Sequence, residues 1–107
     1  MTLKELSQIP HLKEEVELYR ERIRTLEQRE DPLSGEELLH LQSQLEKRDN
    51  ELQRLKSYIE NIPDSGIRNI LTLRCIRGLS WVQISFRVSG YSADNARKTV
   101  KRFLEKN

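Results

Sequence analysis

The 107-residue sequence has one cysteine, three prolines and four glycines, and each scarcity excludes a class of protein. The single Cys75 cannot form an internal disulfide or supply a cysteine-based zinc site. Few prolines and glycines leave few turns, which favours long helices over an all-β fold. No apolar run approaches the roughly 18 residues needed to cross a membrane, and the polar N-terminus lacks the apolar core of a signal peptide. We therefore expect an all-α, cytoplasmic protein with no membrane partner.

The sequence also lacks the motifs of an enzyme. It has no glycine-rich phosphate loop, paired-carboxylate set or activated nucleophile. His11 and His40 are far apart and have no cysteine or carboxylate cluster beside them, which is typical of surface histidines. Cys75 shares its expected helix face with apolar residues, which favours a buried, inert thiol, and Ser80 and Ser92 are explained as helix caps. We expect no catalytic residue, no metal and no cofactor.

Charge is divided unevenly along the chain. Residues 1–62 contain ten Lys/Arg and fourteen Asp/Glu, a balance of −4, whereas residues 63–107 contain nine and three, a balance of +6. The two balances add up to the net charge of +2. A basic domain on an acidic extension predicts a polyanionic partner for the basic domain.

Apolar residues in the first 62 positions recur at the spacing of a coiled coil. Pro10 interrupts the first run after Leu3, Leu6 and Ile9. Either a short helix ends at Ile9 and a second begins with Pro10 in its first turn, or one helix is kinked there. The first seam continues through Leu12, Val16, Tyr19, Ile23 and Leu26. The second seam contains Leu38, Leu41, Leu45, Leu52, Leu55, Ile59 and Ile62, with Arg48 at its one polar position.

A turn over residues 30–37 separates the two seams, and Ser34 with Glu37 has the pattern of a capping box. Such a short connection predicts an antiparallel hairpin, and pairing Leu26 with Leu38 makes both seams end together. Two helices bury little surface, so we expect the hairpin to form a homodimer or to pack on the C-terminal domain. Arg48, the polar residue of the second seam, either sets the register in which the helices pair or extends outward to water.

Three helix-sized patterns occupy residues 63–107, each beginning at a capping residue. The expected helices cover residues 67–77, 81–88 and 92–106. The expected caps are Asp64 or Ser65, then Ser80 with Gln83, then Ser92, and the stops contain Gly78 and Gly90. The side chains expected to point inward from the last two helices are Trp81, Ile84, Val88, Ala96, Val100, Phe103 and Leu104.

A short helix, a turn containing glycine and a more basic helix have the pattern of a helix-turn-helix, whose second helix reads the major groove. Arg97 and Lys98 suit guanine or phosphate, and Asn95 suits adenine. The alternative is that these cations only solubilise a three-helix domain and complement the dipole of its last helix. The segregated charge favours DNA binding. The candidate DNA-contacting residues are Ser92, Asp94, Asn95, Arg97, Lys98, Lys101, Arg102, Arg87 and Arg77.

The C-terminal segment resembles region 4 of sigma-70-family sigma factors. The resemblance rests on three runs: Leu73-Arg74-Cys75-Ile76-Arg77-Gly78, then Leu79-Ser80-Trp81-Val82-Gln83-Ile84-Ser85, then residues 92–98. The chain is also similar to small sigma-like proteins of phages and prophages, whose coiled-coil N-terminus contains a Leu-Ser-Gln-Ile start like Leu6-Ser7-Gln8-Ile9. Cys75 replaces an aromatic residue of the family pattern. The turn Ser89-Gly90-Tyr91 is one residue longer than in that pattern. The DNA-reading helix can therefore be aligned with the family in two ways that differ by one residue.

The resemblance implies a phage transcriptional regulator that reads duplex DNA through its C-terminal helix, with RNA polymerase as a further partner. No counterpart of the promoter-opening sigma region 2 is present, so a complete sigma factor is not expected. Two other classes stay open: a small terminase or packaging subunit, and an adaptor that binds RNA polymerase. The predicted domains are a coiled-coil hairpin in residues 1–62 and a helix-turn-helix in residues 63–107.

Overall fold

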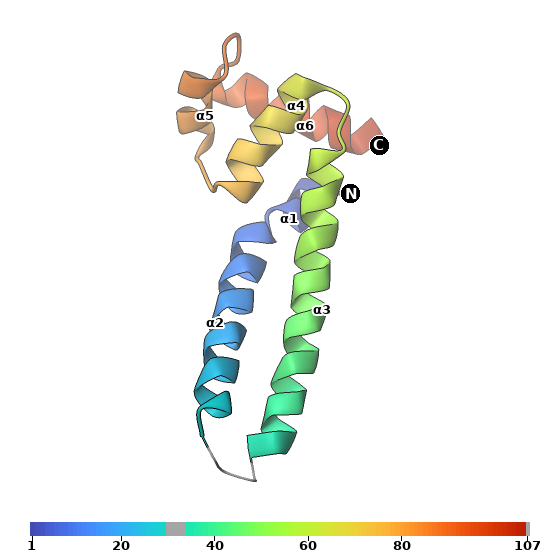
Figure 1. Cartoon of the computed structure of the whole chain (residues 1–107). Helices are drawn as coiled ribbons and strands as arrows, with labels where there is room; N and C mark the ends of the chain where they lie inside the picture. The colour runs from blue at the N-terminus through green and yellow to red at the C-terminus, as the bar shows by residue number, and fades with distance from the viewer. Residues whose placement is uncertain (30–33, 107) are drawn as a thin grey trace. The chain divides into compact units, whose positions relative to one another are not determined.

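The computed structural model describes residues 1–29 and 34–106, and within these ranges it contains only helices and the segments that join them (Figure 1). The expected all-α class is confirmed for the described residues. None of their helices combines the length and the apolarity required to span a bilayer. The elements are α1 (Leu3–Leu6), α2 (Ile9–Glu27), α3 (Ser34–Glu60), α4 (Ser65–Leu71), the π-helix η1 (Thr72–Ile76), α5 (Trp81–Arg87) and α6 (Ala93–Lys106).

Contacts divide the chain into two compact units. One unit contains residues 11–53, and the other contains residues 1–10 together with residues 54–107. The division falls inside α2 and inside α3, not at the predicted domain boundary after Ile62. Leu6, Ile9, Leu55 and Ile59 are all fully buried and all belong to the second unit, which explains why the first ten residues join it. The assignment of DNA binding to residues 63–107 stays a prediction.

The chain begins with a short helix and a break. The Glu5 N–H donates to Thr2 Oγ1 at 3.1 Å and caps α1. Pro10 lies in the first turn of α2, as in the first of the two alternatives, but α1 ends at Leu6 instead of Ile9. The Ser7 hydroxyl donates to the Leu3 carbonyl at 2.6 Å, and Pro10 has no N–H for the carbonyl four residues before it. The Leu3 carbonyl still accepts the Ser7 N–H at 2.8 Å, so the missing N–H of Pro10 is the feature that ends the helix before Ile9.

The predicted helix over residues 67–77 is wrong in its bounds and in its uniform geometry. Asp64 caps α4 by accepting from the Ile67 N–H at 3.1 Å, so the helix begins at Ser65. At Thr72 the backbone changes to a π-helix, whose last bond joins the Arg77 N–H to the Thr72 carbonyl at 3.0 Å. The Thr72 hydroxyl also donates to the Arg68 carbonyl at 2.7 Å, beside the Thr72 N–H, which bonds the same carbonyl.

Two local signals in the C-terminal part are confirmed. Ser80 and Gln83 form a capping box, with bonds of 3.1 Å to Ser80 Oγ and 2.9 Å to Gln83 Oε1. Gly78 ends η1 with a φ of +73°, in the left-handed region that favours glycine.

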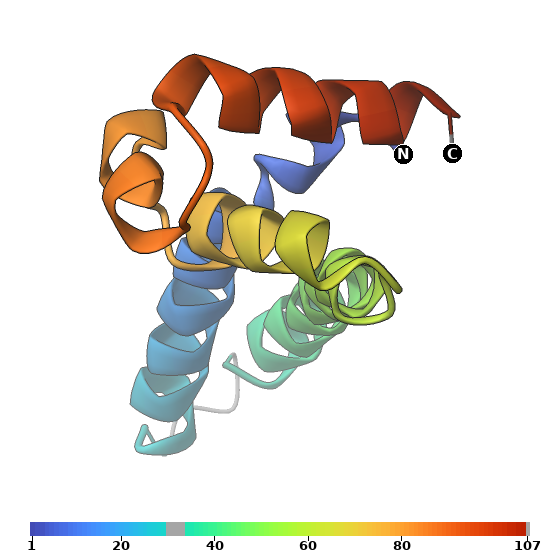
Figure 2. The ribbon, with the colours of Figure 1, turned by 90° about the horizontal axis from the view of Figure 1, so that it is seen from above.

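The core between the last helices is smaller than expected. Ile84, Ala96 and Val100 are fully buried and Leu104 is nearly so. Trp81, Val88 and Phe103 were expected to point inward, and each is only partly buried. Figure 2 shows α6 passing α4, with α5 at the end where α6 begins, and α6 contacts both helices.

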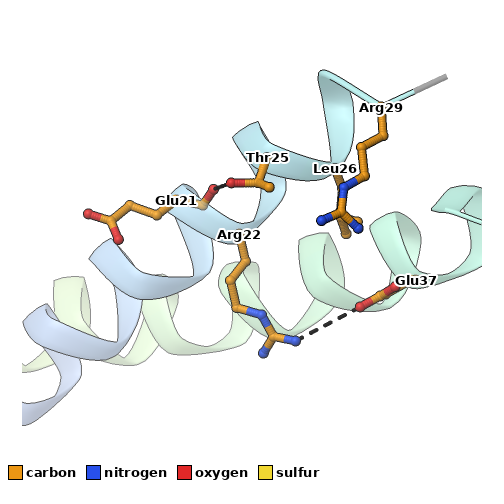
Figure 3. Close-up of a pocket in the computed structure, with 6 residues that line it drawn as sticks. All are labelled: Glu21, Arg22, Thr25, Leu26, Arg29 and Glu37. Atoms are coloured by element: carbon orange, nitrogen blue, oxygen red, sulfur yellow. Dashed lines mark hydrogen bonds and ion pairs between the residues drawn. The ribbon is translucent and has the colours of Figure 1, made fainter. Parts of the chain in front are cut away.

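In the unit of residues 11–53, α2 and α3 lie side by side (Figure 1). Their buried cluster contains Ile23, Leu26 and Leu41, with Tyr19, Leu38 and Leu45 packed against it, and all six are predicted seam residues. Figure 3 shows the end of this cluster, where Arg22 faces Glu37 at 3.9 Å. The predicted turn at 30–33 and the side chain of Ser34 lie outside the described residues, so the capping box with Glu37 stays a prediction.

Arg48 has its partners on α2. Its Nε donates to Glu15 Oε2, and its guanidinium carbon lies 4.7 Å from the centre of the Tyr19 ring. Arg48 Nη1 also donates to Gln44 Oε1 at 2.8 Å. The side chain therefore links the two helices instead of extending into water.

Candidate nucleic-acid interface

Helix α6 has one buried face and one charged face. Ala96, Val100 and Leu104 recur every four residues and are buried, so the helical period leaves most positions between them exposed, except Thr99 and Phe103, which are partly buried. The Asn95 N–H donates to Ser92 Oγ at 3.1 Å, which confirms Ser92 as the cap and fixes where the charged face begins. The exposed candidates on α6 are Asp94, Asn95, Arg97, Lys98, Lys101 and Arg102.

Asp94 holds the two cations of the first turns. Its Oδ2 accepts from Lys98 Nζ at 2.9 Å and its Oδ1 accepts from Arg97 Nη2 at 3.2 Å. These bonds, the one from Lys98 first, hold the pKa of the Asp94 carboxyl below its usual range. All three side chains are exposed, so water and salt weaken the pairs. A phosphate brought to this face would compete with Asp94 for Arg97 and Lys98.

The remaining candidate cations form two groups. Lys101 and Arg102 continue along the exposed face of α6, and neither is in an ion pair within the described ranges. Arg77 and Arg87 are not on α6: they line a shallow hollow beside Gly78 and Phe86, at the end of η1 and along α5. The structure therefore gathers seven of the nine candidates on α6 and its cap and places two elsewhere.

Arg68 and Arg74, two basic residues left out of the predicted site, have partners within the fold. Arg68 Nη1 donates to the Ile62 carbonyl at 2.9 Å. Arg74 Nη1 donates to the Leu79 carbonyl at 3.0 Å, and its guanidinium carbon lies 4.9 Å from the centre of the Trp81 ring. Arg68 and Arg74 thus bind backbone carbonyls, whereas the cations of the predicted site on α6 face solvent.

Phe86 on α5 is a surface feature that the sequence reasoning missed. Its side chain is 84% exposed, and Val82, four residues earlier, is 57% exposed. The signal was present, because a helix that turns Trp81, Ile84 and Val88 inward directs positions 82 and 86 to the opposite side.

Among the described residues, no three His, Cys, Asp or Glu side chains come together as a metal site. His11 Nε2 lies 2.7 Å from Glu15 Oε1 on the same helix. Cys75 is 1% exposed, and burial raises the pKa of its thiol to about 11 against a small opposing effect of Arg74. A thiol with this pKa is protonated at neutral pH and is a poor nucleophile.

The buried thiol makes the free energy of unfolding fall at alkaline pH. Unfolded Cys75 loses its proton near pH 9, whereas the folded chain keeps it to about 11. The contribution is fully present below pH 9 and is lost as the pH rises through this window. It amounts to about 2–3 kcal/mol for two pKa units. Urea unfolding at about pH 8 and about pH 10.5 measures it, and Cys75→Ala should show a smaller fall. Equal falls in both chains would contradict the assignment.

Comparison of the chain with protein-family models, curated proteins and solved structures finds no match. The resemblance to sigma region 4 therefore rests on the sequence motifs alone. The candidate interface is argued from the charges and contacts of α5 and α6.

Proposed function

We propose that the chain is a DNA-binding transcriptional regulator of phage type, in which residues 63–107 act as a sigma-70 region 4-like helix-turn-helix. The observation that carries this proposal is the exposed face of α6. Five cations and two carboxylates of α6 are exposed, while its other face is buried against the rest of the unit. Such a one-sided cationic helix is the electrostatic footprint of a nucleic-acid-binding surface.

The dimensions and residue types of α6 suit the major groove. Its 14 residues span roughly 21 Å at 1.5 Å per residue, and a helix of ordinary diameter fits the groove width of about 12 Å. Arg97, Lys98 and Asn95 in the first turns would meet base edges. Lys101 and Arg102, farther along, would meet phosphates, which add affinity without sequence preference.

Helix α5 would support this reading helix. It contacts α6, and its capping box fixes where it starts. Arg77 and Arg87, near the two ends of α5, would then bind backbone phosphates on either side of the groove.

Selection of genomic DNA fragments by the full chain, followed by salt-dependent mobility shifts, tests the proposal. We expect a common duplex motif to be enriched. Four phosphate-directed cations predict a loss of about 100-fold in affinity between about 50 and about 200 mM salt. Failure to enrich any sequence, or binding that does not respond to salt, would count against DNA reading by α6.

A further inference from the structure

Two exposed apolar patches on this chain have opposite charges around them. The first is on α5, where Phe86 and Val82 are the exposed apolar residues. A phenyl ring 84% open to water is uncommon on a surface that meets no partner. We define the α5 patch as Val82, Phe86, Arg77 and Arg87.

The α5 patch has only positive charge. Arg77 and Arg87 line the same hollow as Phe86, and neither guanidinium is in an ion pair within the part of the chain that the structure describes. Helix α5, with the sequence WVQISFR, contains no acidic residue. A partner that covers Phe86 must therefore bring an apolar side chain flanked by carboxylates.

The second patch has this chemistry and lies on α2. Leu18 is 53% exposed and is not a seam residue. Glu14 and Glu21, four residues before and three after Leu18, are its neighbours on the helix surface, and Glu17 precedes it directly. Arg22, four residues after Leu18, lies 3.9 Å from Glu37. All three glutamates around Leu18 are exposed, and within the described ranges none is in an ion pair. Figure 3 shows the Glu21 carboxylate directed away from Arg22. We define the α2 patch as Leu18 and these three glutamates.

We propose that the α5 patch of one copy binds the α2 patch of a second copy of this chain. Leu18 packs against Phe86 and Val82, and three carboxylates face two guanidiniums. Like charges keep two α5 patches or two α2 patches apart, so only the unlike pair forms. This contact uses outward residues, unlike a dimer through the hairpin seams. It shares Arg77 and Arg87 with the proposed DNA-binding surface, so DNA phosphates would compete with the second copy for these two side chains.

The contact joins two different surfaces, so copies of the chain can assemble either as a closed pair or as an open arrangement. A closed pair makes the contact twice, whereas an open arrangement leaves one patch free at each end. The patches are small, which places the association at the weak end of protein interfaces.

Sedimentation of the full chain from micromolar to near-millimolar concentration tests the proposal. We expect concentration-dependent association, weakened about tenfold or more by Phe86→Ser and by Leu18→Ser, the scale of a lost apolar anchor. Both residues are exposed, so circular dichroism should show unchanged helicity. Leu39→Ser is the matched control, because Leu39 is 69% exposed on α3 and belongs to neither patch. A monomer at all concentrations, or an equal effect of Leu39→Ser, overturns the proposal.

A charge exchange tests the pairing itself. One variant carries Arg77→Glu and Arg87→Glu, and the other carries Glu14→Lys, Glu17→Lys and Glu21→Lys. Each variant alone should be about tenfold or more weaker in self-association, because its two patches then have the same sign. An equimolar mixture should associate again, since each chain supplies the patch that the other needs. A mixture that stays monomeric, or association of either variant alone at the natural strength, overturns the proposal.

Discussion

The double variant Arg97→Ala/Lys98→Ala is expected to bind its duplex site about 30-fold more weakly or worse, since each base or phosphate contact contributes about 1–3 kcal/mol. Both side chains are exposed, and within the described residues their ion pairs are with Asp94 on the same helix, so helicity should be unchanged. Fluorescence anisotropy at low salt with the selected DNA sequence measures the affinity, and circular dichroism measures the helicity.

Two further variants separate specific DNA contacts of α6 from the effect of the chain's net charge on DNA affinity. Asp94→Asn removes the carboxylate that competes with DNA for Arg97 and Lys98, so it should bind about 1.5–5-fold more tightly, the scale of one exposed charge interaction. Lys13→Ala/Arg24→Ala also removes two exposed cations, but from α2, and should change affinity less than about twofold. Equal losses in the two double variants would show that only net charge matters.

Replacing Ile84 by alanine should destabilise the unit that carries α6 by about 2–5 kcal/mol, the cost of a cavity at a well-packed site. Ile84 is 0% exposed and lies on α5. Such a loss is a large fraction of the stability of a small domain, about 5–15 kcal/mol in total. Urea unfolding of the two chains followed by circular dichroism measures the difference.

Val82→Ala is the matched control, because it removes a β-branched side chain from the same helix at a position that is 57% exposed. Its change in free energy of unfolding should stay within about 0.5 kcal/mol. Alanine has a higher helix propensity than isoleucine or valine, so lost propensity cannot explain a decrease in either variant. A similar loss for both variants would contradict the assignment of this stability to the packing of buried Ile84.

Features that depend on neighbouring residues were predictable from the sequence. The capping box of Ser80 and Gln83 and the cap at Ser92 need only a hydroxyl at the right offset. The buried positions Ile84, Ala96 and Val100 follow from helical periodicity.

Features decided by competition between several bonds were not predictable. The π-helix at Thr72 depends on whether each N–H bonds four or five residues back, which no spacing of apolar residues indicates. The partners of Arg48 depend on which α2 side chains come level with it.

The candidate site likewise contains features that the sequence predicts and features that it does not. The cations on the outer face of α6 follow from periodicity, because Arg97, Lys98 and Lys101 alternate with buried positions. The sharing of Asp94 between Arg97 and Lys98 depends on side-chain conformations that the sequence pattern does not determine.

The burial of Cys75 makes the chain its own reporter of transient opening. This residue is the only thiol in the sequence, and it lies in η1 almost completely shielded from water. A thiol-alkylating reagent can reach it only when that part of the fold opens, so the alkylation rate measures the frequency of local unfolding without any added label. A ligand of the C-terminal helices that stabilises the closed state would slow this reaction by the same factor by which it lowers the open population.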